Sequence, residues 1–598
     1  MYDFSGSELI YTIENNPYYF VDFERFKAYN FKVAEKIASY IGFKKDSPKR
    51  VECIFDKAIE KIFNENHKGD TALSINKYKD GVVPEVVSKD INDIIDEAVN
   101  LSSKYYIDGE LSYDFLSKMF AEECFGKYRF TFINDSKYLV NKRLNESEIS
   151  TMNFINYSLS DEPLTKITKR KINNRIKKFE EMESIKFTEE QIDAIHNSIN
   201  NRFSVITGGP GCGKTKVIQA ILYVIQDATD YKKIVTSYTG KALKRVDEVL
   251  NDCNCLIEYD KATLLSYYYT CKFKSSYIFN KVVVIDEASM VSQLVFGQFL
   301  SILDNCQVIL IGDCDQLPSI DAGQVLQDII NSNKVCVSKL TKNLRLQTSD
   351  DDFRDKMLLN YSSILNNNYD DLQYIPDHFS WEFVCEDETK DVVDKIVDDY
   401  MSYINGTNGK EKVDIEDICI LTPTKKEGKS LSSTNLNIHI QEKINPYGED
   451  TFCKYGKDNC IRVDDRVILT KNMQDEGAYN GDVGTVTDCN DNYITVEFDD
   501  GNIVAFDYEK SKDCLELAYA MTVHKSQGSE YKVVLFALDH SSWCDSKFMN
   551  KNLIYTAITK TKGTVLFYGS QNVLRRGIEQ NLNPRVTLLP KYLAFDLT

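Results

Sequence analysis

The stretch GGPGCGKT, from Gly208 to Thr215, decides the fold of this chain. Its spacing is G-x-x-x-x-G-K-[ST], that of a phosphate-binding loop. The residues before it, Phe203–Ile206, are typical of a buried strand, and the apolar run Val217–Ile225 after it is typical of a helix. A strand, a glycine-rich turn and a helix N-terminus aim backbone N–H groups and the helix dipole at a polyphosphate. The sequence therefore predicts that the chain binds a nucleoside triphosphate.

Two side chains of this loop have expected roles. Lys214 should reach the β- and γ-phosphates, and Thr215 should place its hydroxyl on Mg²⁺. The loop as a whole is expected to surround the phosphates, which gives the cofactor-binding set Gly208, Gly209, Pro210, Gly211, Cys212, Gly213, Lys214 and Thr215.

Composition limits the class of protein. A chain of 598 residues is too long for one core and suggests about three to five domains. The net charge of −19 argues against a protein that coats nucleic acid over its whole surface, although a local basic groove would suffice for phosphate contacts. The first residues lack the features of a secretory signal, and no run of 18 apolar residues occurs. We therefore expect no membrane association and a cytoplasmic location, or a nuclear one in a eukaryote or a virus of the nucleus.

The 16 cysteines are scattered and include no C-x-x-C pair of zinc-ligand spacing. Cys253-Asn254-Cys255 comes closest to such a pair. We expect reduced thiols there rather than a metal site.

Two further strands end in polar residues beside the phosphate loop. The segment VVVIDEASM, Val282–Met290, places Asp286 and Glu287 at the carboxyl edge of a sheet. Asp286 should help to hold Mg²⁺, and Glu287 should orient and deprotonate the attacking water. After the next strand, Gln316 could sense the γ-phosphate, although a simple turn would also explain its surroundings.

A third signal precedes the phosphate loop. Thr188 and Gln191 have the spacing of a helix capping box, which accounts for both residues structurally. The amide of Gln191 could also read the edge of adenine, and the two roles are compatible.

These motifs, in the order in which they occur along the chain, resemble those of the RecD-like branch of superfamily 1 helicases, which includes RecD, TraA and Dda. The match covers roughly residues 185 to 570, whereas the first 180 residues match no family that we can name. The segments that carry the resemblance are Phe187–Ile195, Gly208–Thr215, Ser237–Val246, Val284–Met290, Gly312–Gly323, Leu340–Leu346, Ile420–Pro446, Arg462–Val486, Ala518–Tyr531 and Leu553–Gly569.

The resemblance implies an α/β fold with two RecA-like P-loop NTPase domains. The first would span residues 184–345, and the second residues 346–459 and 514–598. Between the two parts of the second, residues 460–513 show short alternating strands with turns at Asn480-Gly481 and Asp500-Gly501, which predicts an inserted small SH3-like β-barrel. Residues 1–183 are expected to form a mainly helical domain of unknown role. Its basic stretch Lys166–Lys178 is expected to be a solvated helix face or linker, with nucleic-acid contact as the alternative.

For the nucleotide site, the resemblance implies ATP and Mg²⁺ as cofactors, additional nucleotide contacts from Gly528 and Glu530, and γ-phosphate contacts from Arg345 and Lys560. The family carries arginine where this chain has Lys560. Arginine offers a planar fork for two phosphate oxygens, whereas lysine is a point charge. We therefore expect a slower turnover, with Lys562 as a candidate substitute.

For nucleic acid, the resemblance implies a track across the two α/β domains that contacts the sugar-phosphate backbone. A helix cap or a solvated charge would explain each candidate taken alone. The residue range 267–280 occupies the place of a family β-hairpin pin that splits duplexes, with Lys272 and Lys274 near phosphates; a half-buried hairpin is the alternative. The nucleic-acid candidates are Thr239, Lys241, Thr522, His524, Lys525 and Asn480.

The function expected from these motifs is that of an ATP-dependent DNA helicase moving 5′ to 3′ on single-stranded DNA, as a monomeric motor. Its partners would be single-stranded and duplex DNA, with other replication or recombination proteins as further candidates. One alternative is an RNA helicase of a related superfamily 1 group, which the few cysteines of the first 180 residues, Cys53 and Cys124, argue against. The other is a nucleic-acid-binding scaffold subunit with a weakened motor, which only Lys560 favours.

Overall fold

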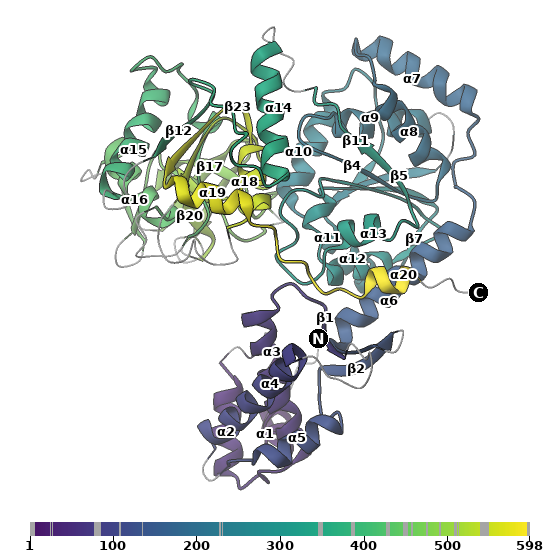
Figure 1. Cartoon of the computed structure of the whole chain (residues 1–598), viewed down its shortest axis with the longest axis vertical. Helices are drawn as coiled ribbons and strands as arrows, with labels where there is room; N and C mark the ends of the chain where they lie inside the picture. Colours follow the sequence, from purple (N-terminus) through teal and green to yellow (C-terminus); the bar gives the residue numbers. More distant parts are fainter. Residues whose placement is uncertain are drawn as a thin grey trace.

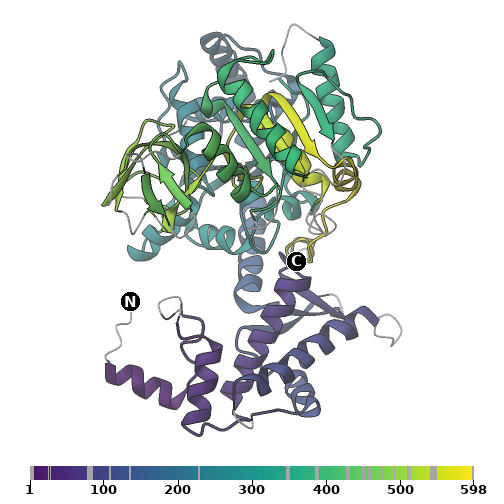
Figure 2. The ribbon, with the colours of Figure 1, turned by 90° about the vertical axis from the view of Figure 1, so that its left-hand side faces the viewer.

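The computed structural model shows two α/β bodies side by side and a smaller N-terminal part below them (Figure 1). A view turned by 90° places the N-terminal part in the same position (Figure 2). None of the described helices is both long enough and apolar enough to cross a membrane. The structure describes residues 6–23, 26, 28–76, 85–106, 109–133, 136–226, 229, 231–344, 351–383, 389–425, 431–446, 452–455, 459–473, 476–489, 492–507, 511, 513–538 and 549–594.

The N-terminal part is mainly helical and has a core of its own. A small antiparallel sheet with the strand order β1-β3-β2 accompanies its helices. Inside this core, the Arg50 guanidinium donates to both carboxylate oxygens of Glu35 at 2.9 Å, which satisfies a charge pair removed from water. Its elements are α1 (Gly6–Asn15), α2 (Phe31–Tyr40), α3 (Pro48–Asn66), β1 (Ala72–Asn76), α4 (Glu85–Lys104), α5 (Tyr113–Ala121), β2 (Tyr128–Ile133) and β3 (Ser136–Asn141). Two further helices lead into the first α/β body and pack on it: α6 (Lys142–Ser160) against α12 (Gln293–Leu300), and α7 (Lys169–Glu183) against α9 (Lys214–Gln226), beside which it lies in Figure 1.

The first α/β body is a six-stranded parallel sheet with the order β11-β4-β10-β8-β5-β6. Alternate residues of its strands face two separate apolar cores, one beneath α8 and α9 and the other beneath α11 and α12. Strands covered on both faces read as continuous apolar runs, which is the sequence pattern observed. Its elements are α8 (Glu189–Asn200), β4 (Phe203–Gly208), α9 (Lys214–Gln226), β5 (Lys232–Ser237), α10 (Gly240–Asn251), β6 (Asp260–Lys261), α11 (Leu264–Phe273), β7 (Ile278–Phe279), β8 (Lys281–Asp286), α12 (Gln293–Leu300), β9 (Leu303–Asp304), β10 (Gln307–Gly312), α13 (Val325–Asn331) and β11 (Cys336–Leu340).

The second α/β body is a five-stranded parallel sheet with the order β12-β23-β22-β13-β21. The predicted α/β architecture with two parallel sheets is therefore confirmed. Its elements are α14 (Asp351–Leu365), β12 (Phe379–Phe383), α15 (Thr389–Asn405), β13 (Ile418–Thr422), α16 (Ser433–Ile444), β21 (Ala520–Thr522), β22 (Tyr531–Leu538), α18 (Lys551–Ile558), β23 (Thr561–Gly569) and α19 (Gln571–Glu579).

An antiparallel sheet is inserted into the second body, with the order β19-β18-β17-β16-β20 and its own apolar core. Asp500-Gly501 forms the predicted hairpin turn between β18 and β19. Asn480-Gly481 also forms a turn, closed by Asp482 N donating to Tyr479 O at 2.9 Å, but this turn lies within the longer loop between β16 and β17. The strands, with the adjoining ribbon, are β14 (Phe452–Tyr455), β15 (Asn459–Arg462), β16 (Arg466–Leu469), β17 (Val483–Cys489), β18 (Tyr493–Phe498), β19 (Ile503–Asp507) and β20 (Leu515–Leu517).

The predicted β-hairpin at residues 267–280 is wrong. The first half of this range belongs to helix α11, which the Thr263 side chain caps by accepting from Ser266 N. Leu264 and Cys271, seven residues apart, are buried on one face of the helix, and this packing favours helix over strand. The only strand in the range is β7, which pairs with β9 in parallel.

The chain returns from the second body across the first. After α19, the segment runs to helix α20 (Leu589–Ala594), which packs against α6 and α13 (Figure 1). Along this segment Arg585 donates to Ser319 O at 2.7 Å, and Thr71 N donates to Val586 O at 3.0 Å. The C-terminal segment thus ties together the N-terminal part and both α/β bodies.

Candidate nucleotide site and nucleic-acid face

A pocket lies where the two α/β bodies meet, and both bodies contribute to its walls. The first body supplies the phosphate loop, the acidic pair at the end of β8 and the loop after β10. The second body supplies the loop before β22 and the turn after α18. Gly208, Gly209 and Gly528 are not among the lining residues, and Arg345 lies outside the described part of the chain. The predicted site residues that line the pocket are Gln191, Pro210, Gly211, Cys212, Gly213, Lys214, Thr215, Asp286, Glu287, Gln316, Glu530 and Lys560.

The phosphate loop connects β4 directly to α9. The Lys214 ammonium donates to Gly208 O at 2.6 Å and to Gly209 O at 3.0 Å. Burial opposes the charged form of Lys214, but Cys212, Asp313 and then the acidic pair outweigh it and raise the pKa of this amine. The site therefore holds a positive charge beside the backbone of the phosphate loop, which favours binding of a polyphosphate.

The acidic pair stands where the sheet ends. Asp286 is the last residue of β8 and is buried; burial, reinforced by the charge of Glu287, raises its pKa to about 6. Glu287 has a left-handed backbone conformation with φ 52° and ψ 41°. A residue other than glycine adopts this conformation at a cost of order 1–3 kcal/mol, and such residues cluster at functional sites. Asp286 is thus buried at the end of the sheet, and Glu287 has the strained backbone that is common at functional sites.

Gln316 connects the two bodies. Its Nε2 donates to Asp313 Oδ2 at 3.2 Å, and its Oε1 lies 3.4 Å from Lys560 Nζ. Asp313 also accepts from the hydroxyl of Tyr555, on α18, at 3.4 Å. The loop after β10 therefore contacts the second body through the side chains of Gln316 and Asp313.

Lys560 is 4% exposed, and burial lowers the pKa of its amine. The candidate substitute Lys562 is half exposed and does not line the pocket. Its Nζ lies 4.0 Å from Glu530 Oε2, at the rim. Of Lys551, Lys560 and Lys562, only Lys560, in the turn between α18 and β23, lines the pocket.

The capping box at the start of α8 is confirmed. Gln191 N donates to Thr188 Oγ1 at 3.2 Å, and Thr188 N donates to Gln191 Oε1 at 2.9 Å. In addition, Gln191 Nε2 donates to Cys212 O at 3.0 Å, which fastens this helix to the phosphate loop. One lone pair and one hydrogen of the amide remain for a base, so adenine reading stays a prediction.

Arg245 is a site residue that the sequence motifs do not predict. This side chain lines the pocket from α10 and forms an ion pair with Glu530 of the second body. Burial would lower its pKa, but Glu530 and then the acidic pair raise it. Arg245 follows Lys241 by four residues, so the sequence places both on one face of α10. This spacing does not say whether that face lines a pocket, because the second body forms part of the pocket wall.

The first group of nucleic-acid candidates lies where α10 meets the inserted sheet. Thr239 caps α10 by accepting from Ala242 N at 3.2 Å, so its structural role is confirmed. Gly481 lies beside the Lys241 side chain, and the Asn480 backbone N–H donates to Asn472 Oδ1 at 2.9 Å. The structure thus brings Thr239, Lys241 and Asn480 together, and their contact with nucleic acid stays a prediction.

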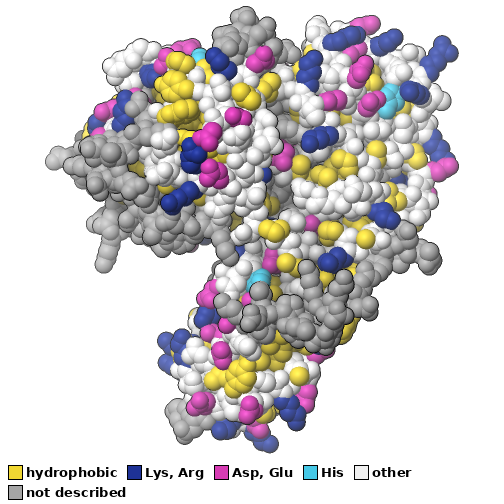
Figure 3. Space-filling view, viewed as in Figure 1, with side chains coloured by type: hydrophobic (Ala, Val, Ile, Leu, Met, Phe, Trp, Pro, Cys, Tyr) yellow, Lys and Arg dark blue, Asp and Glu magenta, His cyan; other side chains and the backbone are white. Residues whose placement is uncertain are grey.

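The second group follows β21. Thr522 ends this strand, and the Lys525 ammonium donates to Glu516 Oε2 at 2.9 Å. His524 is half-buried, and burial followed by the nearby Lys68 lowers its pKa. Gly528, in the same loop, packs against Ala242 of α10, so the two groups of candidates are neighbours. On the face shown in Figure 3, acidic and basic side chains are mixed, which fits a local track better than a broad basic surface.

Three family models match the chain. An AAA domain model matches residues 186–359, and a UvrD-like helicase C-terminal domain model matches residues 517–568. The third, for the HHH domain of the ATP-dependent RecD2 DNA helicase, matches residues 1–72. Residues 1–72, in which we find no motif, thus have a family counterpart.

Curated relatives show the same likeness. An uncharacterized protein of Methanocaldococcus jannaschii is 26% identical over 534 residues, covering 75% of this chain and 45% of the relative. The ATP-dependent RecD2 DNA helicase of Deinococcus radiodurans is 26% identical over 406 residues, covering 67% of this chain and 52% of the relative. The RecBCD enzyme subunit RecD of Haemophilus influenzae is 23% identical over 474 residues, which cover 66% of this chain and 71% of the relative. The chain spans about half the length of the first two relatives.

Among solved structures, the Pif1 helicase from Bacteroides in complex with ADP-AlF3 and single-stranded DNA is similar over 64% of this chain and 92% of that one. The sequence identity is 22% and the TM-score 0.41. The family models and the curated relatives confirm the resemblance to RecD-like superfamily 1 helicases.

Proposed function

We propose that the chain is an ATP-dependent DNA helicase that moves 5′ to 3′ on single-stranded DNA and unwinds duplexes. The observation that carries this proposal is the pocket shared by the two α/β bodies. A phosphate loop and an acidic pair face a buried lysine from the other body across this pocket. Hydrolysis at such a site is coupled to relative movement of the bodies, because the site is complete only when they are close together.

The proposed division of the chain follows its sheets. Residues 1–183 form a helical domain, residues 184–345 the first RecA-like motor domain, and residues 346–459 with 514–598 the second. Residues 460–513 form the small SH3-like barrel, although strand β20, at Leu515–Leu517, pairs with the same sheet. A core within residues 18–139 and another within the inserted sheet support the division, whereas α6, α7 and α20 contribute Ile155, Ile172 and Leu589 to the cores of the first body.

We propose ATP and Mg²⁺ as the cofactors. The Thr215 hydroxyl and the Asp286 carboxylate are the groups suited to hold Mg²⁺, which would neutralise charge on the β- and γ-phosphates. Lys214 would exchange the carbonyl oxygens of Gly208 and Gly209 for phosphate oxygens. Glu287 would orient the attacking water and accept its proton.

Contacts across the pocket would couple chemistry to movement. Gln316 meets Lys560 there, and Arg245 meets Glu530. When the γ-phosphate leaves, Gln316 and Lys560 lose their shared partner and the bodies can separate. Arg345, which lies outside the described residues, retains its proposed γ-phosphate role on the sequence motif alone.

We propose that the strand passes over the junction of α10, the inserted sheet and the loop after β21. Thr239, Lys241 and Asn480 would contact it from one side, and Thr522, His524 and Lys525 from the other. Because a motor must pass every sequence, backbone contacts are expected and base-edge contacts are not. The motor would act as a monomer, with other replication or recombination proteins as candidate partners.

The test is steady-state ATP hydrolysis measured without nucleic acid, with single-stranded DNA, and with single-stranded RNA of the same sequence. We expect strong stimulation by DNA, after which duplexes with a 5′ or a 3′ tail decide the polarity. Stimulation by RNA alone would instead support an RNA helicase. Nucleotide binding without stimulation by either strand would support a scaffold subunit with a weakened motor.

A further inference from the structure

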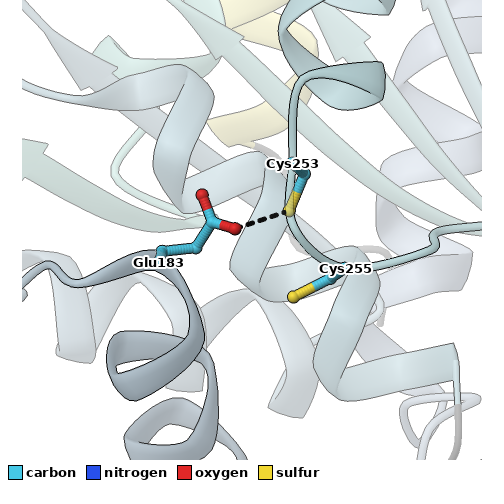
Figure 4. Close-up of side chains that lie close together, drawn as sticks. All are labelled: Glu183, Cys253 and Cys255. Atoms are coloured by element: carbon cyan, nitrogen blue, oxygen red, sulfur yellow. Dashed lines mark hydrogen bonds between the residues drawn. The ribbon is translucent and has the colours of Figure 1, made fainter.

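Two cysteines and a carboxylate converge on the first α/β body, outside the nucleotide pocket. Glu183 ends α7, and Cys253 and Cys255 lie in the loop after α10. One carboxylate oxygen and the two sulfur atoms all lie within 4.8 Å of one another. Figure 4 shows the Glu183 side chain, from the end of α7, meeting the two cysteines of the loop after α10. Within the described part of the chain, no other trio of histidine, cysteine or acidic side chains comes this close together.

The spacing fits ligands around one small ion. Cys253 Sγ lies 3.3 Å from Glu183 Oε1. Around tetrahedral zinc, with Zn–S of about 2.3 Å and Zn–O of about 2.0–2.2 Å, neighbouring sulfur and oxygen ligands lie about 3.5 Å apart and two sulfur ligands about 3.8 Å apart. Small movements of the side chains would therefore bring all three atoms to bonding distance of a common centre.

The surroundings suit a thiophilic cation. Cys255 is 3% exposed and the Glu183 side chain 4%, whereas Cys253 is half-buried and leaves a path of entry. Met182 Sδ lies 3.9 Å from Cys255 Sγ, which adds a third sulfur atom to the neighbourhood. Sulfur ligands select zinc over the oxygen-seeking ions Mg²⁺ and Ca²⁺.

The charged groups around the cluster also suit a divalent cation. Lys216 Nζ lies 2.9 Å from Glu183 Oε2, so the carboxylate keeps its other oxygen, Oε1, toward the sulfurs. Oε1 accepts from Asn254 N at 2.7 Å and still has a lone pair for an ion, because a carboxylate oxygen can accept more than one partner. Two thiolates and one carboxylate around a divalent ion leave a single negative charge, which Lys216 can offset.

We propose that Glu183, Cys253 and Cys255 bind zinc, with water in the fourth position. On binding, each thiol gives its proton to solvent, and the two thiolates and Glu183 Oε1 form bonds to the ion. The hydrogen bond from Cys253 to Glu183 is replaced by these bonds. The ion joins the end of α7 to the loop after α10 and so stabilises the folded chain.

The test is a cobalt titration of the full-length chain, reduced and freed of metal by a chelator. We expect one equivalent of Co²⁺ to bind, with thiolate-to-cobalt charge-transfer absorption that one equivalent of Zn²⁺ removes. C253S and C255S should each reduce this absorption, and the double variant should abolish it. E183Q should keep the thiolate bands while cobalt affinity falls at least about tenfold, the loss typical of perturbing a metal site. C336S is the matched control, since Cys336 begins β11 and is not part of the cluster.

Thermal melting provides a second readout. Zinc should raise the melting temperature of the wild-type chain and of C336S, but not that of C253S, because an ion that binds only the folded state stabilises it. Cys255 is more deeply buried than Cys253, so C255S could impair folding. In that case C253S alone still tests the proposal. Wild-type protein without thiolate-to-cobalt absorption, or a double cysteine variant that keeps it, would overturn the proposal.

Discussion

Replacing Lys560 by arginine should accelerate ATP cleavage. Lys560 Nζ is a single point charge that donates a hydrogen bond to Gln316 Oε1 at 3.4 Å. Arginine at the same position could donate two parallel hydrogen bonds to phosphate oxygens. One additional hydrogen bond to a charged group contributes about 1.5–3 kcal/mol, which corresponds to an increase of about 10- to 150-fold in the rate of the chemical step.

The assay is single-turnover hydrolysis by rapid quench in the presence of saturating single-stranded DNA, because product release can mask the chemical step in the steady state. K562R is the matched control. It makes the same exchange at a half-exposed side chain that does not line the pocket, and we expect the rate to stay at the wild-type value.

The pH profile gives an independent signature. Burial lowers the pKa of Lys560, so in the free enzyme its charge is lost earlier than usual as the pH rises. Because kcat/KM reports the ionisation of the free enzyme, it should fall on the alkaline side for the wild type. In K560R this decline should disappear, since arginine stays charged. If K560R changes neither the single-turnover rate nor the alkaline decline, Lys560 does not act on the γ-phosphate.

Three further substitutions test other parts of the site and fold. K214A should abolish hydrolysis while binding of single-stranded DNA persists in a fluorescence anisotropy assay; turnover that DNA still stimulates would refute the phosphate-loop assignment. G213A should weaken nucleotide binding and lower the melting temperature, because φ is +78° at this residue and an added Cβ would lie 2.5 Å from Gln191 Nε2. The left-handed backbone alone costs about 1–2 kcal/mol with a side chain present, so wild-type stability would contradict this reasoning. Burial raises the pKa of Glu148 to about 7, so its protonated form stabilises the fold at low pH and this contribution is lost as the pH rises through about 7. E148Q should therefore stabilise the protein at pH values above 7, by up to about 3 kcal/mol, and flatten the dependence of melting temperature on pH; an unchanged dependence would show that Glu148 is not its source.

The sequence predicts those features of this protein that depend on interactions between residues close together in the chain. The phosphate loop follows from the spacing of its glycines and Lys214, because a strand, a tight turn and a helix start are set by neighbouring residues. The capping box follows from Thr188 and Gln191 for the same reason. Parallel strands covered on both faces follow from continuous apolar runs such as Val282–Ile285.

Local pattern failed where a segment's packing partners were far away in sequence. The range 267–280 was expected to be a hairpin by analogy, but a capped helix forms there because Leu264 and Cys271 pack into the core of the first body. Arg245 lines the nucleotide pocket only because Glu530, from the other body, pairs with it. Helical spacing places Leu264 with Cys271, and Lys241 with Arg245, on one face of a helix, but it does not say what that face packs against.

The sequence by itself thus determined that this chain has a phosphate loop, two parallel α/β sheets and the ordered motifs of RecD-like helicases. Only the tertiary structure decided which side chains share a site. It placed Lys560 against Gln316, and it brought Glu183 to Cys253 and Cys255, whose own spacing predicts no zinc site. The physical reason is that backbone preferences and apolar periodicity act over a few residues, whereas a site is completed by side chains that meet only after the sheets and helices have packed.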